Sequence, residues 1–226
     1  MEREELLAQL IDEIAERKRF GRPLLVGIDG PCASEKTFLA NELAAALAAR
    51  NPAMKILRPS VDGFHSAREL RYRQGEYSAS GYYEDAYDYQ ALIEYLLRPL
   101  SGGSFPVLCR QVSHDLRTDL PADAPPVAVG PNAVLLFEGL FLFRREINDY
   151  WDLRILLDVS AEQSIARAVA RDTGILGAAE IVKKKYELRY EPAWRIYVEA
   201  ESPTTKADWI IDNEDICNPR LAKPAD

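Results

Sequence analysis

The segment from Gly30 to Thr37 has the residue types and the spacing of a loop that binds phosphate groups. It follows the pattern G-x-x-x-x-G-K-[ST] at every fixed position except the second glycine. In such a loop, backbone N–H groups surround phosphate oxygens, the lysine contacts the β- and γ-phosphates, and the final hydroxyl binds Mg²⁺. The pattern therefore predicts that a nucleoside triphosphate binds at Gly30, Pro31, Cys32, Ala33, Ser34, Glu35, Lys36 and Thr37.

Glu35 occupies the position of the second glycine. A residue other than glycine costs about 1–3 kcal/mol if its φ must be positive. A carboxylate ~5 Å from a phosphate charge adds about 3 kcal/mol of repulsion at an effective dielectric of ~20. With partial compensation from Mg²⁺ and Lys36, we expect triphosphate binding to be roughly 30- to 1000-fold weaker than with glycine. Two interpretations stay open: a departure that the fold tolerates, or a substitution that weakens this chain.

The residues around the loop are those that a phosphate site requires. Leu24–Ile28 is a short apolar run that predicts a buried strand. After the loop, apolar residues recur at helical spacing until Asn51-Pro52 ends the pattern. The motif is therefore expected between a strand and a helix, where the helix N-terminus also attracts phosphate.

Apolar runs and helical patterns alternate through the remaining sequence, which predicts an α/β fold with a mostly parallel, helix-covered sheet. Pro59 suits an edge strand, and the proline-rich stretch 121–131 is expected to be a surface loop. The other expected strands are 133–137, 153–159 and 209–211, with short strands within 105–116, and the expected helices include 3–18, 92–100, 162–172, 178–190 and 191–201.

The composition limits the class of protein. The chain has 226 residues and a net charge of −8, so it lacks the basic excess of a general nucleic-acid binder. No apolar run approaches the ~20 residues of a membrane span. Three scattered cysteines and a charged N-terminal segment favour a cytoplasmic protein. We expect one domain over residues 1–226, with a small-molecule partner, no nucleic acid and no membrane, and a homo-oligomer is left open.

Two carboxylates are candidates for chemistry. Glu138 ends the strand 133–137, and the carboxyl end of a parallel strand faces the ligand crevice, so Glu138 could hold Mg²⁺ directly or through water. The alternative is a solvated acid at a strand end. Asp62 follows the second expected strand, 55–60, and could accept a proton from a substrate hydroxyl. Its alternative is an Asp-Gly turn with Gly63.

Other side chains are candidates for binding. Arg167 and Arg171 are four residues apart on one helix face, so they could clamp phosphates from a lid over approximately 172–200, or form a solvated face. Tyr82 and Tyr83 could stack on a base or sugar, or could fill a partly buried loop. His114 is either a substrate contact or a structural histidine.

Several segments together make the chain resemble the uridine kinase and phosphoribulokinase superfamily, and within it the uridine/cytidine kinase-like branch. The segments are Gly27–Thr37, Val61–His65, Leu136–Leu140, the stretch from Asp158 to Asp172, and Ala207–Ile211. The resemblance implies a P-loop NTPase-type parallel sheet of about five strands, with helices on both faces and a helical lid. It also implies ATP and Mg²⁺, with Asp62 as catalytic base, Glu138 near the metal, and Arg167 and Arg171 in the lid.

The sequence departs from this family where the nucleoside would be recognised. Cys109 and Arg110 stand where uridine/cytidine kinases have tyrosine and aspartate, and Tyr82 stands near the position of their acidic sugar contact. Arg110 is kept as a substrate-binding candidate. The favoured function is phosphoryl transfer to uridine or cytidine, with Lys36 and the lid arginines stabilising charge. The alternatives are a kinase of another metabolite hydroxyl, such as pantothenate or a sugar, or a P-loop module that binds nucleotide poorly and acts through a partner.

Overall fold

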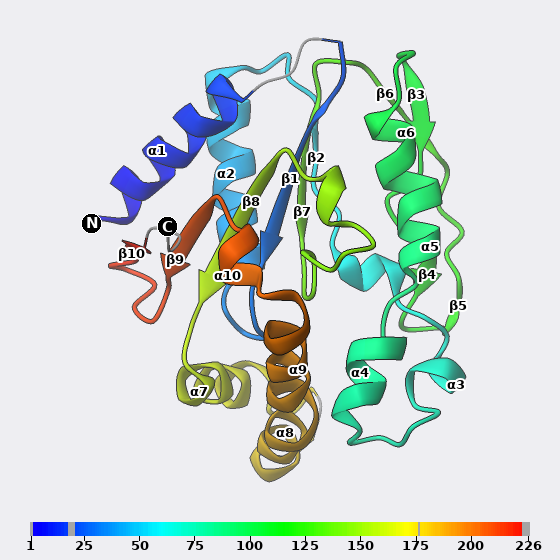
Figure 1. The fold of residues 1–226 in the computed structure, drawn as a ribbon, viewed down its shortest axis with the longest axis vertical. Coiled ribbons are helices and arrows are strands. Elements are labelled where there is room, and N and C mark those ends of the chain that lie inside the picture. Colours follow the sequence, from blue (N-terminus) through cyan, green and yellow to red (C-terminus); the bar gives the residue numbers. More distant parts are fainter. Residues whose placement is uncertain (1, 18–20, 176, 223–226) are drawn as a thin grey trace.

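The computed structural model describes residues 2–17, 21–175 and 177–222, and its centre is one mixed sheet (Figure 1). The strand order is β10-β9-β8-β1-β7-β2, and β2, β7, β1, β8 and β9 run parallel. The strands are β1 (Leu24–Asp29), β2 (Ile56–Leu57), β7 (Val134–Glu138), β8 (Leu153–Asp158), β9 (Trp209–Asp212) and β10 (Arg220–Ala222). The expected parallel sheet of about five strands with its second strand at an edge is confirmed.

The antiparallel strand β10 was not expected from the sequence. It pairs with β9 through residues 220–222, and none of these side chains is buried. A three-residue strand without an apolar face has no periodic signal, because only its backbone hydrogen bonds define it.

Helices cover both faces of the sheet, as the alternating pattern predicts. On one face, α1 (Arg3–Glu16) and α2 (Lys36–Arg50) bury Leu10, Leu43 and other apolar residues against β1, β7 and β8. The helix expected over 3–18 ends at Glu16, and Lys18 lies outside the described residues. On the other face, α5 (Tyr89–Leu92), a π-helical turn (Ile93–Leu97) and α6 (Arg98–Ser101) form a continuous helix over the core around Phe137.

The expected lid segment lies beyond the carboxyl ends of the strands (Figure 1). It follows α7 (Ala161–Asp172) and contains α8 (Ala179–Lys185), a π-helical turn (Tyr186–Tyr190) and α9 (Glu191–Glu201), which continue one another. The short helix α10 (Pro203–Lys206) leads into β9. Since α9 packs on the sheet core through Ala193 and Tyr197, this segment is anchored at its C-terminal part.

Short elements complete the rim of the sheet. They are the 3₁₀ turns η1 (Val61–Phe64) and η3 (Asn148–Tyr150), the helices α3 (Arg68–Arg71) and α4 (Ala79–Asp85), and the strands β3 (Val107–Cys109), β4 (His114–Asp115), β5 (Leu120–Pro121) and β6 (Val127–Val129). The surface loop expected over 121–131 is therefore corrected. Its valines alternate around exposed Ala128, so β6 pairs with β3 and buries Val129.

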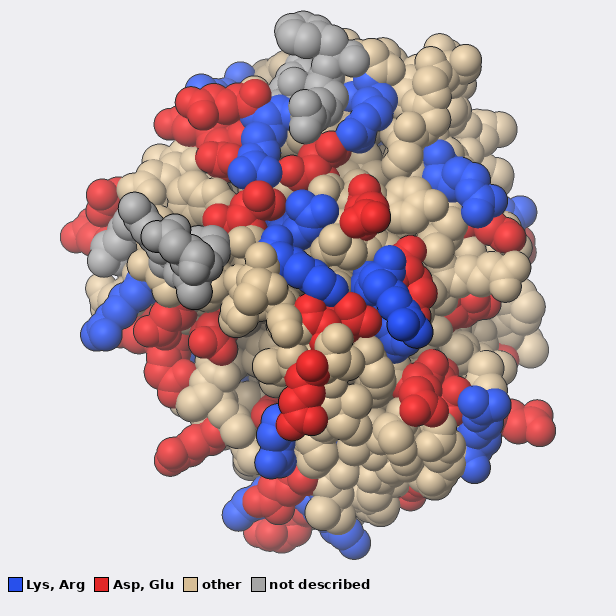
Figure 2. Space-filling view, viewed as in Figure 1, with Lys and Arg blue, Asp and Glu red and all other residues tan. Residues whose placement is uncertain are grey.

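Acidic and basic side chains are interspersed over the face of the molecule shown in Figure 2. In the part of the chain that the structure describes, no helix is long and apolar enough to cross a membrane.

Candidate active site

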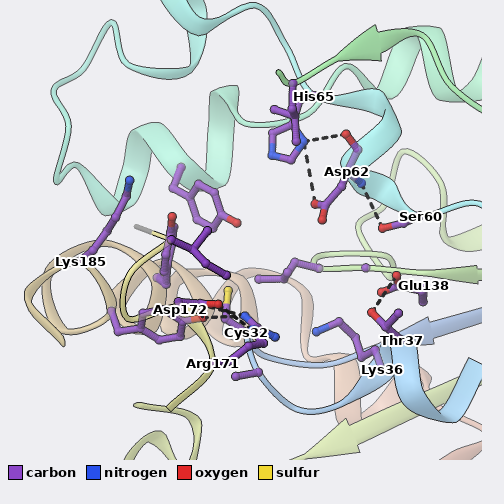
Figure 3. Close-up of a pocket in the computed structure, with 18 of the residues that line it drawn as sticks. Cys32, Lys36, Thr37, Ser60, Asp62, His65, Glu138, Arg171, Asp172 and Lys185 are labelled. Carbon is purple, nitrogen blue, oxygen red and sulfur yellow. Dashed lines mark hydrogen bonds and ion pairs between the residues drawn. The ribbon is translucent and has the colours of Figure 1, made fainter. Parts of the chain in front are cut away.

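A pocket of about 450 Å³ lies at the carboxyl ends of the strands, between the predicted phosphate loop and the segment that contains α8 (Figure 3). Its walls come from the loop before α2, the end of β7 and the residues after it, the turn η1, and the segment around α3. The helices α7 and α8, the π-helical turn after α8, and single residues of α4 and of the β4–β5 hairpin complete them. Parallel strands direct the loops at their carboxyl ends toward one edge, so residues far apart in sequence meet here.

The predicted phosphate loop has a positive φ at three positions, which are Gly30, Ala33 and Glu35. Gly30 has φ of 155°, and a Cβ atom there would lie 2.6 Å from the carbonyl oxygen of Leu157. Glu35, the N-cap of α2, has φ of 68° and ψ of 32°, in the left-handed region. The carboxylate residue therefore occupies a conformation that costs about 1–3 kcal/mol for a residue with a side chain.

Lys36 extends across this loop from the first turn of α2. Its side chain is buried, and its Nζ donates to the carbonyl oxygens of Gly30 at 2.9 Å and of Pro31 at 2.6 Å. Both acceptors are neutral, so the charge of Lys36 is not cancelled by them. A cation held in this way lies inside the turn of backbone amides that phosphates require.

Thr37 and Glu138 meet beside Lys36. The Thr37 hydroxyl donates to Oε1 of Glu138 at 3.1 Å. The contact follows from the parallel ladder, because β1 pairs with β7 and aligns Ile28 with Glu138. A hydroxyl and a carboxylate oxygen are suitable ligands for Mg²⁺, which usually keeps several waters as well.

Asp62 lies across the pocket from this pair, on η1. The turn can approach β7 because residue 139 is glycine: a Cβ atom there would overlap the side chain of Val61. The Ser60 hydroxyl accepts from the Asp62 backbone N–H at 3.2 Å. The Asp62 side chain is 64% exposed, so its carboxylate is accessible to a ligand.

His65 supports the same turn. Its Nδ1 lies 2.9 Å from the carbonyl oxygen of Asp62 and 3.8 Å from Oδ1 of the same residue. Burial lowers the pKa of His65, although the charge of Asp62 opposes this effect. A neutral ring at pH 7 therefore lines the pocket next to the carboxylate.

A buried acid connects the loop to α9. Asp29, at the end of β1, accepts from the Tyr197 hydroxyl at 2.5 Å and from the Gly30 backbone N–H at 2.8 Å. The Tyr197 oxygen in turn accepts from the backbone N–H of Phe143 at 2.9 Å. Burial raises the pKa of Asp29 to about 6, against the lowering effect of these hydrogen bonds. The sequence analysis missed this pair, because 168 residues separate its members.

The structure separates the two arginines that were expected to act together. Arg171 lines the pocket, where its Nε donates to Oδ1 of Asp172 at 2.7 Å. The hydrogen bonds with Asp172 raise the pKa of Arg171, and the charge of Glu35 adds to this. Arg167 instead donates to the carbonyl oxygens of Asn213 and Glu214 and is not among the lining residues. Arg167 lies one helical turn nearer the loop after β9, so the structure does not bring the two arginines together, and the paired clamp stays a prediction.

The predicted acceptor contacts are likewise divided. Tyr82 lines the pocket, where its hydroxyl lies 3.3 Å from that of Tyr87. The other three candidates are not among its lining residues. Tyr83 packs its ring under the Arg144 guanidinium at 4.2 Å, and Arg110 lies over the Tyr95 ring at 5.8 Å. His114 bonds to Asp119 at 2.9 Å. None of these three lines the pocket, because each side chain packs against another residue, and their role in acceptor binding stays a prediction.

The pocket also contains residues that the sequence analysis did not select. They include His65, Arg71, Tyr72, Leu116, Asp172, Ile175, Lys185, Tyr186 and Tyr190. His65 could have been found, since it belongs to the same motif as Asp62. Arg71 and Lys185 could not, because no local pattern links residues on α3 and α8.

A phosphate loop between a parallel strand and a helix, with a carboxylate from the adjacent strand beside it, defines a P-loop nucleotide-binding protein. Residues 25–215 of the chain match the sequence pattern of the "Phosphoribulokinase / Uridine kinase family". The chain belongs to this family, and it has the P-loop kinase fold.

Two curated relatives agree with this assignment. Uridine kinase-like protein 3 from Arabidopsis thaliana is 26% identical over 204 residues, which cover 88% of this chain but only 41% of the relative. Uridine-cytidine kinase 2-B from Danio rerio is 25% identical over 84% of this chain and 73% of its own length.

Two solved structures are also similar. One, described as a possible uridine kinase from Bacillus stearothermophilus, has a TM-score of 0.68 and 26% identity, and the match covers 92% of this chain and 97% of that chain. The other, a candidate fructose transport system kinase from Silicibacter sp. TM1040, has a TM-score of 0.67 and 25% identity, with 86% and 95% covered. The names of these two structures refer to different acceptors, uridine in the first and fructose in the second.

Proposed function

We propose that this chain is a kinase that transfers the γ-phosphoryl group of ATP to a hydroxyl of a small molecule. The observation that carries the proposal is the gathering of Lys36, Thr37 and Glu138 at one end of a pocket that Asp62 faces from the other side. We call the part around the phosphate loop and Arg171 the phosphate end. The part beyond Asp62, with Arg71, Tyr72 and Lys185, is the acceptor end.

Each group has a role that its position supports. The loop amides and Lys36 would hold the triphosphate, and Thr37 and Glu138 would hold Mg²⁺, the ion that neutralises charge on the phosphates. In the described residues, no group of three or more His, Cys, Asp and Glu side chains could hold a metal ion by itself. Phosphate oxygens and water would therefore complete the magnesium shell.

The transfer step needs one base and one cation beyond the loop. The acceptor oxygen forms a bond to the γ-phosphorus as the bond to the β-phosphate oxygen breaks, ADP leaves, and the hydroxyl proton passes to Asp62. Arg171, at the same end as Glu35, would stabilise charge on the moving group. Arg167 has no part in this scheme, because it does not line the pocket and its Nη2 donates to the carbonyl oxygens of Asn213 and Glu214.

Uridine or cytidine is the first acceptor to test, because the names of the relatives point to it. A different metabolite hydroxyl, as in pantothenate or a sugar, is the second candidate. It is favoured by the packing of Arg110 on the Tyr95 ring and of Tyr83 on Arg144, because neither side chain lines the pocket. The retention of Lys36, Asp62 and Glu138 in one pocket argues against a module without catalysis.

A coupled ADP-release assay tests the proposal on the native chain and on Glu35→Gly, each with uridine, cytidine, pantothenate and fructose. The expected result is acceptor-dependent ADP release that Asp62→Ala abolishes. If neither protein releases ADP with any of the four acceptors, a kinase of these substrates is contradicted and the partner-binding alternative is favoured. Release that persists in Asp62→Ala would assign the base role elsewhere.

A further inference from the structure

Cationic and acidic side chains line both ends of the pocket, but the balance between them differs. Glu35 and Glu138 lie at the phosphate end, and Asp172 is bonded to Arg171. At the acceptor end, the lining cations are Arg71 and Lys185. Figure 3 shows Lys185 on the opposite side of the pocket from Lys36 and Thr37. Among the described lining residues, Asp62 is then the one carboxylate left to face the acceptor end.

Arg71 is only partly neutralised by its surroundings. Its Nη2 donates to Oδ1 of Asp119 at 3.2 Å, but Asp119 also accepts from His114 and from the Arg68 backbone N–H. The Arg71 side chain is 13% exposed, and its Nε is buried with no hydrogen-bond partner. Buried N–H groups nearly always have hydrogen-bond partners, so the unpaired Nε of Arg71 is unusual. Since Asp119 occupies only Nη2, Arg71 can still donate to a further acceptor.

Lys185 has no hydrogen bond or ion pair to any described residue. Its half-buried amino group lies 5.8 Å from the centre of the Tyr72 ring, whereas Lys183 on the same helix pairs with Glu187. One helical turn further along the chain, the buried guanidinium of Arg189 donates only to carbonyl oxygens, including those of Glu76 and Arg71. Asp119 compensates Arg71 only in part, and no described acid pairs with Lys185 or Arg189, so the acceptor end has an excess of basic side chains.

We infer that the acceptor carries an anionic group, a carboxylate or a phosphate, which Arg71 and Lys185 bind while its hydroxyl faces Asp62. The inference rests on the proposed phosphoryl transfer and narrows its substrate class. A guanidinium and an ammonium are the side chains that bind carboxylates and phosphates by charge-assisted hydrogen bonds. A neutral nucleoside would leave both cations without a counter-charge. The Tyr72 ring and Leu116 provide apolar contacts for the carbon skeleton between the two groups.

The experiment compares acceptors that differ only in the anionic group. The carboxylate arm uses pantothenate against pantothenol and glycerate against glycerol, and the phosphate arm uses fructose 6-phosphate against fructose. ADP release is measured at saturating ATP for the native chain, Lys185→Gln and Arg71→Gln. Lys184→Gln and Arg68→Gln are matched controls, since both parent residues are neighbours that do not line the pocket.

The expected result is at least 100-fold higher kcat/KM for the anionic member of one pair. Lys185→Gln should raise the KM of that member about tenfold or more, while its kcat, the KM of ATP and the rate with the neutral member stay within twofold. Equal rates for both members of every pair would overturn the inference, as would a Lys185→Gln defect confined to the KM of ATP.

Thermal-shift titration with the same acceptor pairs, beside a non-hydrolysable ATP analogue, separates this inference from the proposed function. Binding of an anionic member that Lys185→Gln weakens, without any ADP release, would support the anion site and contradict the kinase. ADP release with neutral acceptors only would support the kinase and overturn the anion site. Binding of no anionic member would also overturn it. Lys185→Gln keeps the test valid if Arg71→Gln does not fold, because no described side chain depends on Lys185.

Discussion

The two ends of the pocket are built by different parts of the fold. At the phosphate end, Lys36, Thr37 and Glu138 come from α2 and β7, which adjoin the fully buried strand β1. At the acceptor end, Arg71 and Lys185 come from α3 and α8, outside the sheet. Glu138 belongs to the hydrogen-bonded ladder of the sheet and Thr37 bonds to it, whereas Arg71 and Lys185 lie on helices outside that ladder. The acceptor end can therefore change its substrate without disturbing the nucleotide site.

Removal of Asp62 should have the largest effect, and it tests whether the two ends work independently. Asp62→Ala is expected to lower kcat by roughly 10²- to 10⁴-fold, because the acceptor hydroxyl loses its base. ATP affinity should stay within a few-fold, since Asp62 does not touch the phosphate loop in the described contacts. ADP release and titration calorimetry measure the two effects, with exposed Asp123→Asn as the control. A matching loss of ATP affinity would show that the ends are coupled.

Glu35 is expected to lower the affinity of the phosphate end for ATP. Glu35→Gly should tighten ATP binding at least tenfold, because it removes both a left-handed residue with a side chain and a carboxylate near the phosphates. Glu35→Ala removes only the charge and keeps the unfavourable φ, so it should recover part of that gain. Measurement of the ATP affinities of the three proteins by calorimetry separates the effect of the charge from the effect of the backbone conformation. Equal affinities for all three would mean that the loop tolerates Glu35 at no cost.

The buried Asp29 should make the stability of the phosphate end depend on pH. Its pKa in the folded state is about 6, above the ordinary value of 3.8, so the folded protein binds the proton more tightly. The stability from the protonated form is complete below about pH 4 and is lost as pH rises through 6. Relative to Asp29→Asn, the native chain should lose about 2 kcal/mol of unfolding free energy between pH 4 and 7.

Urea denaturation at several pH values measures this difference, and Asp123→Asn serves as the exposed control. A constant difference between the native chain and Asp29→Asn across this range would show that Asp29 has an ordinary pKa.

The smallest expected effect distinguishes the two arginines of α7. Arg171→Ala should lower kcat about tenfold, because a cation beside the transferring phosphoryl group is lost. Arg167→Ala should leave kcat within threefold, since its partners are the carbonyl oxygens of Asn213 and Glu214. Steady-state kinetics of both variants provides the measurement. An equal decrease of kcat in both variants would mean that Arg167 also acts on the phosphates, and that it moves toward the pocket when substrates bind.

The sequence predicted one end of the pocket much better than the other. Gly30, Lys36 and Thr37 are neighbours in sequence, and the strand–loop–helix pattern sets their geometry locally. Glu138 was found because a buried run ends on it, and β1–β7 pairing then brings it to Thr37. Arg167 and Arg110 were assigned by spacing and by family position, and neither rule contains the packing that directs them elsewhere.

The sequence by itself determined the phosphate loop, the parallel sheet and the family, because each depends on short-range patterns of backbone conformation and burial. Only the tertiary structure decided which cations enter the pocket. Arg71, Arg171 and Lys185 meet there, while Arg167 and Arg189 bond to backbone carbonyl oxygens. Long basic side chains look alike in a sequence, and their role depends on which carbonyl, carboxylate or open space lies within reach after the helices have packed.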